Sequence, residues 1–155
     1  MNQQKKTITE QQALQKLAAL CARGEHCQYD LTEKLRRWGV DDEAQARIMA
    51  KLVDGHYVDD ERYARAFVSD KVRFAKWGRR KVEQALWQKH ISEDISHRVL
   101  DEVAEENYSE TLRQLLAQKR KTIKAASDYE LNQKLIRFAL SRGFTYDIIS
   151  ECFDL

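Results

Sequence analysis

Basic side chains recur along one side of a predicted helix in the middle of the chain, in a pattern suited to binding an anionic partner. Asp59 and Asp60 are typical N-cap residues, and no Pro or Gly follows them before Gly78. At about 100° per residue, four cations share a strip about 80° wide, which we call the basic strip: Arg62, Arg65, Arg73 and Lys76. Arg80 joins the basic strip if the helix continues past Gly78. No Asp or Glu falls within it.

Electrostatic repulsion is the physical argument for a partner at this strip. Like charges three or four residues apart on a helix cost roughly 0.2 to 0.5 kcal/mol per close pair. A face that meets only water normally dilutes such cations with Glu. The alternative is that the strip only keeps a small protein in solution, and the sequence leaves both interpretations open. Related cations lie on the polar side of a later helix: Arg113, Arg120 and Lys124.

Motifs of catalysis and of cofactor binding are absent from the sequence. The chain has no GxxxxGK[ST], HExxH or GxSxG pattern, which argues against the enzymes that use them. Cys21, Cys27 and Cys152 lack CxxC spacing, and His26 has no second pair of ligands nearby, so neither a disulfide framework nor a zinc site is predicted. We expect no catalytic activity, no metal and no cofactor. The formal net charge is only +2, so attraction for an anion must come from clustered charge.

The elements that must position these cations are helices. The 155 residues include no Pro and five Gly, and each Gly lies at the edge of an apolar periodic segment. Thr9 with Gln12 and Ser127 with Glu130 have the spacing of capping boxes. Opposite the basic strip, a broad apolar face predicts a helix packed on a core: Tyr63, Ala64, Phe67, Val68, Val72, Phe74, Ala75 and Trp77. The sequence therefore predicts an all-α protein.

A three-helix pattern recurs along the chain. The apolar pair Leu31 and Leu35 returns 51 residues later as Val82 and Leu86, and a similar pair follows 53 residues after that, each time before a turn at Gly39, His90 or Gly143. Each repeat is expected to have one long helix and two short ones. A unit of about 50 residues buries little apolar surface alone, so we expect an elongated, curved array of three tandem three-helix repeats. The predicted divisions are a polar tail at 1–8 and repeats at 9–58, 59–107 and 108–155.

Aromatic residues beside cations suggest an alternative, a helical nucleic-acid-binding module. Trp38, Trp77 and Trp87 have basic neighbours, as in proteins that stack the bases of single strands. We interpret Trp77 and Trp87 instead as packing residues, because they lie beside apolar core positions. The N-terminus has no apolar signal-peptide region and no apolar run approaches about 18 residues, so we expect a cytoplasmic protein outside the membrane.

Three ordered blocks make the sequence resemble the RecX family of bacterial recombination regulators: ARGEHCQYDLTEKL, GHYVDDERYARAFV and LIRFALSRGFTYDII. The resemblance covers roughly residues 14–149. The sequence departs from the family pattern at three helix edges. Cys27 stands where the family usually has Ser, Arg79 where a Pro is frequent, and His90 where a Gly is usual. The matched blocks mostly carry core and capping residues: Leu31, Leu35, Tyr57, Asp59, Asp60, Tyr63, Phe67, Gly143 and Phe144.

The resemblance implies a non-enzymatic regulator that binds the RecA recombinase filament on single-stranded DNA. RecX-like proteins are described as lying in the filament groove across neighbouring subunits. There they oppose filament extension and the ATPase, strand-exchange and coprotease activities. Weak direct DNA binding also fits the family, and a monomer is expected because an array in a groove has no need to dimerise. The partner-binding residues expected from the charge pattern are Arg62, Arg65, Arg73, Lys76, Arg80, Arg113, Arg120 and Lys124.

Overall fold

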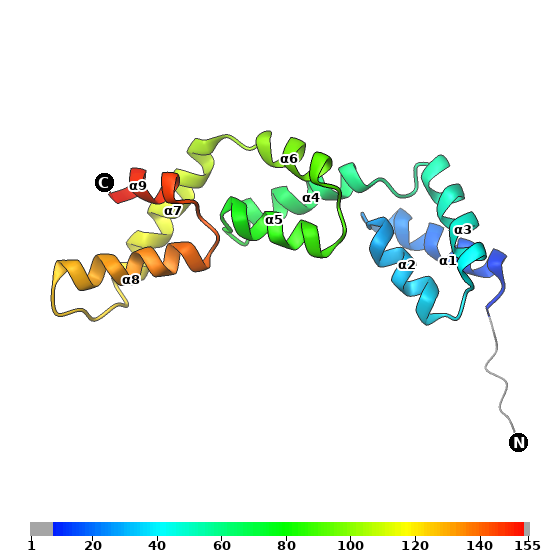
Figure 1. Ribbon diagram of the computed structural model, residues 1–155, viewed down its shortest axis with the longest axis horizontal. Helices are drawn as coiled ribbons and strands as arrows, with labels where there is room; N and C mark the ends of the chain where they lie inside the picture. The colour runs from blue at the N-terminus through cyan, green and yellow to red at the C-terminus, as the bar shows by residue number, and fades with distance from the viewer. Residues whose placement is uncertain (1–7, 154–155) are drawn as a thin grey trace, which may run out of the picture.

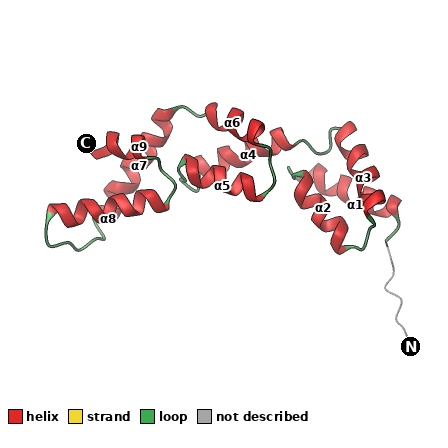
Figure 2. Cartoon of the chain, in the orientation of Figure 1, coloured by secondary structure: helices red, strands yellow, loops and turns green. Residues whose placement is uncertain are grey.

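The structure is a computed structural model that describes residues 8–153 of the chain. Nine α-helices and no strand occur within these residues, so the prediction of an all-α protein is confirmed. The expected polar tail at 1–8 lies outside the described residues except for Ile8. Only turns and loops connect the helices (Figure 2).

The helices follow one another in three groups of three, which we call units 1, 2 and 3. Unit 1 contains α1 (Glu10–Arg23), α2 (Gln28–Arg37) and α3 (Asp42–Asp54). Unit 2 contains α4 (Asp60–Arg73), α5 (Arg79–Gln88) and α6 (Glu93–Asp101). Unit 3 contains α7 (Glu105–Arg120), α8 (Asp128–Ser141) and α9 (Tyr146–Phe153). The units succeed one another along the long axis of an arched molecule, which confirms the elongated array of three-helix repeats (Figure 1).

Helix lengths follow the expected order of one long and two short helices only in unit 2, where they are 14, 10 and 9 residues. In unit 1, α3 has 13 residues against 14 in α1. In unit 3, α8 has 14 residues against 16 in α7. The length of each helix depends on where its caps lie rather than on its place in the unit. The start of α7 at Glu105 precedes residue 108, where the third repeat was expected to begin.

Short-range capping explains where most helices begin. Thr9 accepts a hydrogen bond from the Gln12 N–H at 3.1 Å, and the Gln12 side chain accepts one from the Thr9 N–H at 3.0 Å, so this capping box is confirmed. The second predicted box differs in one bond. The Ser127 hydroxyl accepts from the Glu130 N–H as expected, but the Glu130 carboxylate accepts from the N–H of Ala126, one residue earlier than a regular box requires.

A left-handed residue follows the second helix of every unit, as the repeat predicts. The φ angles are 76° at Gly39, 57° at His90 and 89° at Gly143. Few residues other than Gly adopt this conformation, and His is among the more tolerant ones. This turn sends the chain back so that the third helix of each unit packs on the first: α3 on α1, α6 on α4 and α9 on α7.

An ion pair between the first and third helices also repeats. Glu10 on α1 pairs with Arg47 on α3 at 2.7 Å, and Glu61 on α4 pairs with Arg98 on α6, 51 residues further on for both partners. In unit 3 a hydrogen bond replaces the ion pair: Glu151 on the third helix accepts a hydrogen bond from the Ser109 hydroxyl on the first at 2.7 Å. In units 1 and 2 the sequence repeat therefore extends from the core to the surface.

Buried apolar residues form two separate clusters. One lies inside unit 1 and is built mainly from Leu17, Leu31, Leu35, Ile48 and Leu52. The other runs continuously through units 2 and 3, from Ala64 on α4 to Ile149 on α9. Cys27, in the loop between α1 and α2, is the one buried residue of unit 1 that belongs to this second cluster. Units 2 and 3 thus share a core, whereas unit 1 has its own.

The apolar face predicted over residues 63–77 is confirmed within α4 but not beyond it. Ala64, Val68 and Val72 are buried, and Tyr63 and Phe67 pack partly buried against the second cluster. The prediction fails at Phe74, which follows the last residue of α4 and is 79% exposed. A helical period has no meaning after the helix ends, so the position of Phe74 could not follow from it.

The tryptophans divide between packing and exposure. Trp77 packs against the second cluster, with the ammonium groups of Lys71 and Lys81 at 5.0 and 4.5 Å from its ring. Its interpretation as a packing residue is therefore confirmed. The same interpretation is wrong for Trp87, which is 70% exposed. Leu86 takes the core position on α5, and the next residue in a helix points about 100° away from it.

Candidate functional site

The basic strip is shorter than the sequence predicts. The helix α4 ends at Arg73, and Lys76 lies in the following loop with a left-handed φ of 58°. The N–H of Trp77 returns to the Lys71 carbonyl oxygen at 3.0 Å and closes this loop. The expectation that Lys76 shares a helix face with the three arginines is wrong, because the turn breaks the helical period. Arg80 belongs to a different helix, α5.

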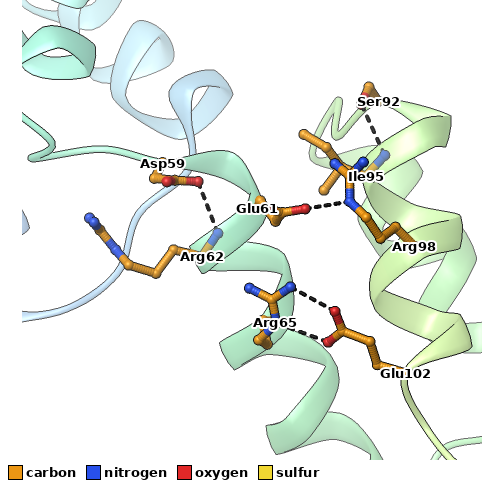
Figure 3. A network of polar contacts seen from close by, with 8 residues as sticks. All are labelled: Asp59, Glu61, Arg62, Arg65, Ser92, Ile95, Arg98 and Glu102. Atoms are coloured by element: carbon orange, nitrogen blue, oxygen red, sulfur yellow. Dashed lines mark hydrogen bonds and ion pairs between the residues drawn. The ribbon is translucent and has the colours of Figure 1, made fainter.

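Two arginines of the strip are held by carboxylates from outside α4, and Figure 3 shows one of these contacts, between Arg65 and Glu102. Arg65 donates two hydrogen bonds to Glu102, at 2.9 and 2.7 Å, and its guanidinium lowers the pKa of that carboxyl. Arg62 donates to Glu25 at 2.6 Å and to the carbonyl oxygens of His56 and Tyr57 at 3.1 and 3.2 Å. The acids that the strip lacks along its own helix therefore come from neighbouring segments.

The other candidate cations are less engaged. Among residues 8–153, no carboxylate lies within ion-pair distance of the remaining six, and Arg113 donates only to the Glu151 carbonyl oxygen at 3.4 Å. These six are Arg73, Lys76, Arg80, Arg113, Arg120 and Lys124. Within the described chain, these six cations therefore face solvent without a carboxylate at ion-pair distance.

The structure distributes the cations over several surfaces instead of one strip. Arg65 and Arg73 line a cleft of about 480 Å³ between α4, α6 and α7. Arg113 and Arg120 line another of about 400 Å³ beside α9. Arg80 lines a third, of about 500 Å³, between α5 and α6. Lys76 and Lys124 lie in the loops that follow α4 and α7. The eight candidates are thus spread along units 2 and 3.

Sequence reasoning missed the surface that surrounds Trp87. This exposed ring shares its cleft with Arg80, Glu83 and His97, and the last two lie 3.4 Å apart. The first turn of α5 also carries three basic residues, at positions 79–81, and no acid. Acids are favoured at this end of a helix, so the cations there are not explained by helix stability. The core position of Leu86 was the signal that could have placed Trp87 on the surface.

Neither a metal-binding cluster nor an activated Cys27 thiol occurs in the described part of the chain. No group of three or more His, Cys, Asp or Glu side chains within residues 8–153 could hold a metal ion. Burial raises the pKa of the Cys27 thiol to about 11, which is opposite to the activation that a nucleophilic thiol needs. Over the same residues, no helix is both long and apolar enough to span a membrane.

Tandem three-helix units, with cations spread along their surface, define this molecule as a helical-repeat protein. Two family models match this chain: the second three-helix domain of RecX at residues 59–100 and the third at residues 105–153. The regulatory protein RecX of Acinetobacter baylyi is 34% identical over 133 residues, which are 86% of this chain and 80% of that protein. The chain therefore belongs to the RecX family of regulatory proteins.

Other similar proteins agree with this assignment. The regulatory protein RecX of Clostridium botulinum (strain Eklund 17B / Type B) is 32% identical over 121 residues, 77% of this chain. The match spans only 56% of that relative's length. The crystal structure of RecX from Lactobacillus salivarius has a TM-score of 0.86 at 19% identity and covers 94% of both chains. At this level of identity the structural match supports the fold.

Proposed function

We propose that this chain binds the filament that the RecA recombinase forms on single-stranded DNA, and that it restrains filament extension and the ATPase, strand-exchange and coprotease activities. Membership of a family of regulatory proteins carries this proposal, because the resemblance to RecX implies the recombinase as partner. The protein is proposed to act as a cytoplasmic monomer through binding alone, without catalysis or a cofactor.

The shape of the molecule supports binding to a filament. An array of similar units offers similar surfaces at regular intervals, which suits a partner built from repeated subunits. The cations without a carboxylate partner are the proposed points of contact: Arg73, Lys76, Arg80, Arg113, Arg120 and Lys124. Arg62 and Arg65 are proposed to contribute mainly by holding the segments to which they are bonded.

Charge reversal at the end of α4 tests this proposal. Replacing both Arg73 and Lys76 by Glu should weaken filament binding by several kcal/mol, roughly the scale measured for charged interface contacts. A control with the same change in net charge is Arg37→Glu with Lys51→Glu, at exposed positions of unit 1. Binding is measured by inhibition of ATP hydrolysis by preformed filaments, and folding by thermal melts.

The expected result is normal melting of both variants, with loss of inhibition only in the first. Inhibition by wild-type protein well below one copy per recombinase subunit would support action on the filament. If the variant at Arg73 and Lys76 melts normally and still inhibits at the wild-type concentration, the contact surface lies elsewhere.

Direct DNA binding by a helical module is the second candidate function. The acid-free first turn of α5 favours it, together with the position of Arg80 in the same cleft as the exposed Trp87. Binding through Z phosphates of a single strand gives a log–log salt slope of about −0.7Z. Filament binding that persists at salt concentrations abolishing binding to free DNA would favour the regulator. A stoichiometric requirement with the salt slope of free-DNA binding would favour the DNA-binding module.

A further inference from the structure

The junction between units 2 and 3 is made by the main chain. The Gly78 N–H donates to the Arg142 carbonyl oxygen at 2.8 Å, and the Arg80 N–H donates to the Gly143 carbonyl oxygen at 2.9 Å. The two segments touch so closely that a Cβ added at Gly78 would lie 2.3 Å from the backbone nitrogen of Phe144. The Phe144 ring is itself buried in the cluster that units 2 and 3 share. This junction cannot change its angle without breaking main-chain bonds and opening a core.

The junction between units 1 and 2 depends on side chains. Arg62 pairs with Glu25 at 2.6 Å, and Lys89 pairs with Asp30 at 3.0 Å. The Asp60 carboxylate accepts a hydrogen bond from the Gln28 N–H at 2.9 Å. Among the described residues, no hydrogen bond from main chain to main chain joins these two units.

Ring stacking and one buried thiol complete this junction. The Tyr29 ring stacks on the His90 imidazole, with centroids 3.9 Å apart and planes at 14°. Cys27 is the residue of unit 1 that is buried in the second cluster. These contacts come from the end of the α1–α2 loop and the first turn of α2, and neither Cys27 nor Tyr29 belongs to the separate core of unit 1.

Equivalent places in the repeat are thus joined in different ways. Asp30 lies 51 residues before Lys81, so the two residues occupy equivalent positions of the repeat. Asp30 forms an ion pair at the junction between units 1 and 2, whereas Lys81 packs against Gly143 at the junction between units 2 and 3. Lys89 and His90 lie 53 residues before Arg142 and Gly143. Within residues 8–153, two ion pairs join different units, and both join unit 1 to unit 2. Each of the other eight ion pairs joins two residues of the same unit.

We propose that the junction between units 1 and 2 is an electrostatic hinge whose closed position is set by Arg62 and Lys89, while units 2 and 3 move as one body. Exposed ion pairs are weak and are screened by salt, whereas main-chain bonds beside a shared core are not. Cys27 and Tyr29 form the pivot, and the two ion pairs hold the angle. Arg62 and Lys89 are therefore positioning residues. If the proposed function is correct, the hinge adjusts unit 1 to the spacing of filament subunits.

Single-molecule energy transfer in the full-length protein tests the hinge. Dyes at Ala46→Cys and Gln84→Cys report on the junction between units 1 and 2, and dyes at Gln84→Cys and Gln118→Cys report on the other; all three positions are exposed. Cys21 and Cys152 are replaced by Ser in this background, and the buried Cys27 is kept. Each pair is measured at about 50 mM and about 500 mM salt, where the screening length falls from above to below about 10 Å.

A charge-reversal variant and a matched control separate the junction from general charge effects. Glu25→Lys with Asp30→Lys breaks both ion pairs between units 1 and 2. Glu10→Lys with Glu33→Lys makes the same change in net charge but breaks two pairs inside unit 1. Adding Lys89→Asp to an Asp30→Lys variant restores one pair with reversed polarity and should recover the closed distance.

The hinge predicts a change at one junction only. The reversal variant at about 50 mM salt, and the wild type at about 500 mM, should show a wider distance distribution between units 1 and 2. The ratio of open to closed molecules should rise about five- to tenfold, as expected for losing two exposed pairs. The distance between units 2 and 3 should not change. An unchanged distance between units 1 and 2 in both experiments, or an equal change at both junctions, overturns the proposal.

Filament titration shows separately whether the hinge serves the proposed function. If wild-type protein does not bind recombinase filaments, the proposed function fails while the energy-transfer result stands. If the reversal variant opens the hinge but inhibits filament ATPase as the matched control does, the hinge exists without tuning filament binding. If the reversal variant loses inhibition, the matched control keeps it, and restoring the ion pair between residues 30 and 89 recovers it, the result supports both the hinge and the proposed function.

Discussion

Replacing Gly78 by Ala tests the contact between units 2 and 3 with a single methyl group. The backbone at Gly78 has φ −78° and ψ 167°, which Ala adopts without strain. The added Cβ, however, would lie 2.3 Å from the Phe144 nitrogen and 2.4 Å from the Gly143 carbonyl carbon. Both are main-chain atoms, so the α8–α9 turn must move away. The change therefore acts on the junction and not on local backbone preference.

The size of the effect can be estimated from what the movement disrupts. Two main-chain hydrogen bonds contribute about 1 kcal/mol each, and partial exposure of the Phe144 ring costs about 2 kcal/mol more. Ala in a compatible conformation recovers about 0.4 to 1 kcal/mol by restricting the unfolded chain. The expected loss is about 3 kcal/mol, and a domain of this size loses roughly 2 to 4 °C in Tm for each kcal/mol. Thermal melts should therefore show a decrease of about 6 to 12 °C.

Two other glycines are matched controls, because no heavy atom lies within 4 Å of an added Cβ at either. Gly24 has an extended φ of 175°, so Gly24→Ala should leave the Tm unchanged or slightly higher. Gly39 has a φ of 76°, so Gly39→Ala should cost about 1 to 2 kcal/mol from backbone strain alone. If Gly78→Ala melts like Gly24→Ala, the tight junction between units 2 and 3 is refuted.

Three further predictions concern burial and charge. Phe144→Ala should lower the free energy of unfolding by about 3 to 5 kcal/mol, because the ring is buried. Trp87→Ala, at a 70% exposed position, should change it by no more than about 0.5 kcal/mol, and equal losses in thermal melts would contradict the exposure of Trp87. Iodoacetamide should alkylate the other two cysteines of the native protein and spare Cys27, because burial raises its pKa to about 11; equal labelling by mass spectrometry would refute this. Arg65 lowers the pKa of Glu102, so their pairing stabilises the protein at pH values above the ordinary carboxyl pKa, and this stabilisation is lost as the pH falls through the lowered pKa. In urea titrations, Glu102→Gln should therefore have a lower free energy of unfolding than the wild type at pH 7, and this difference should shrink below about pH 4.

Helix starts and the repeat could be predicted because they depend on neighbours in the sequence. The caps at Thr9, Asp41 and Asp59 all accept hydrogen bonds from residues three positions later. The turns at Gly39 and Gly143 need a left-handed residue at the same place in each repeat. Signals of this range can be read from a few residues at a time, whatever the rest of the chain does.

The end of α4 could not be predicted in the same way. No Gly or Pro marks Arg73, and the helical period of the sequence continues through Lys76. The helix stops there because Trp77 packs into the second cluster and the Gly78 N–H is bonded to Arg142 in unit 3. These are tertiary contacts between distant residues, and they override the local preference for helix.

The carboxylate partners of the basic strip could not be predicted for a related reason. Arg62 and Arg65 each meet a glutamate 37 residues away, at Glu25 and Glu102. A strip that contains no acid of its own is therefore partly neutralised by carboxylates from other segments of the fold. Sequence periodicity describes one helix at a time, so it finds the cations but not the carboxylates that face them.

Contacts between units give the molecule a direction. At each junction the residues at or just before the start of the second helix of one unit meet the turn after the second helix of the next, as in the Tyr29 contact with His90 and the Gly78 contact with Arg142. The two sides of such a contact differ, so the array is not symmetric under end-to-end reversal. A filament whose subunits all point the same way also has two distinguishable ends. If the proposed function is correct, a directional array matches such a polymer in one orientation only, and the unit nearest a given filament end should always be the same one.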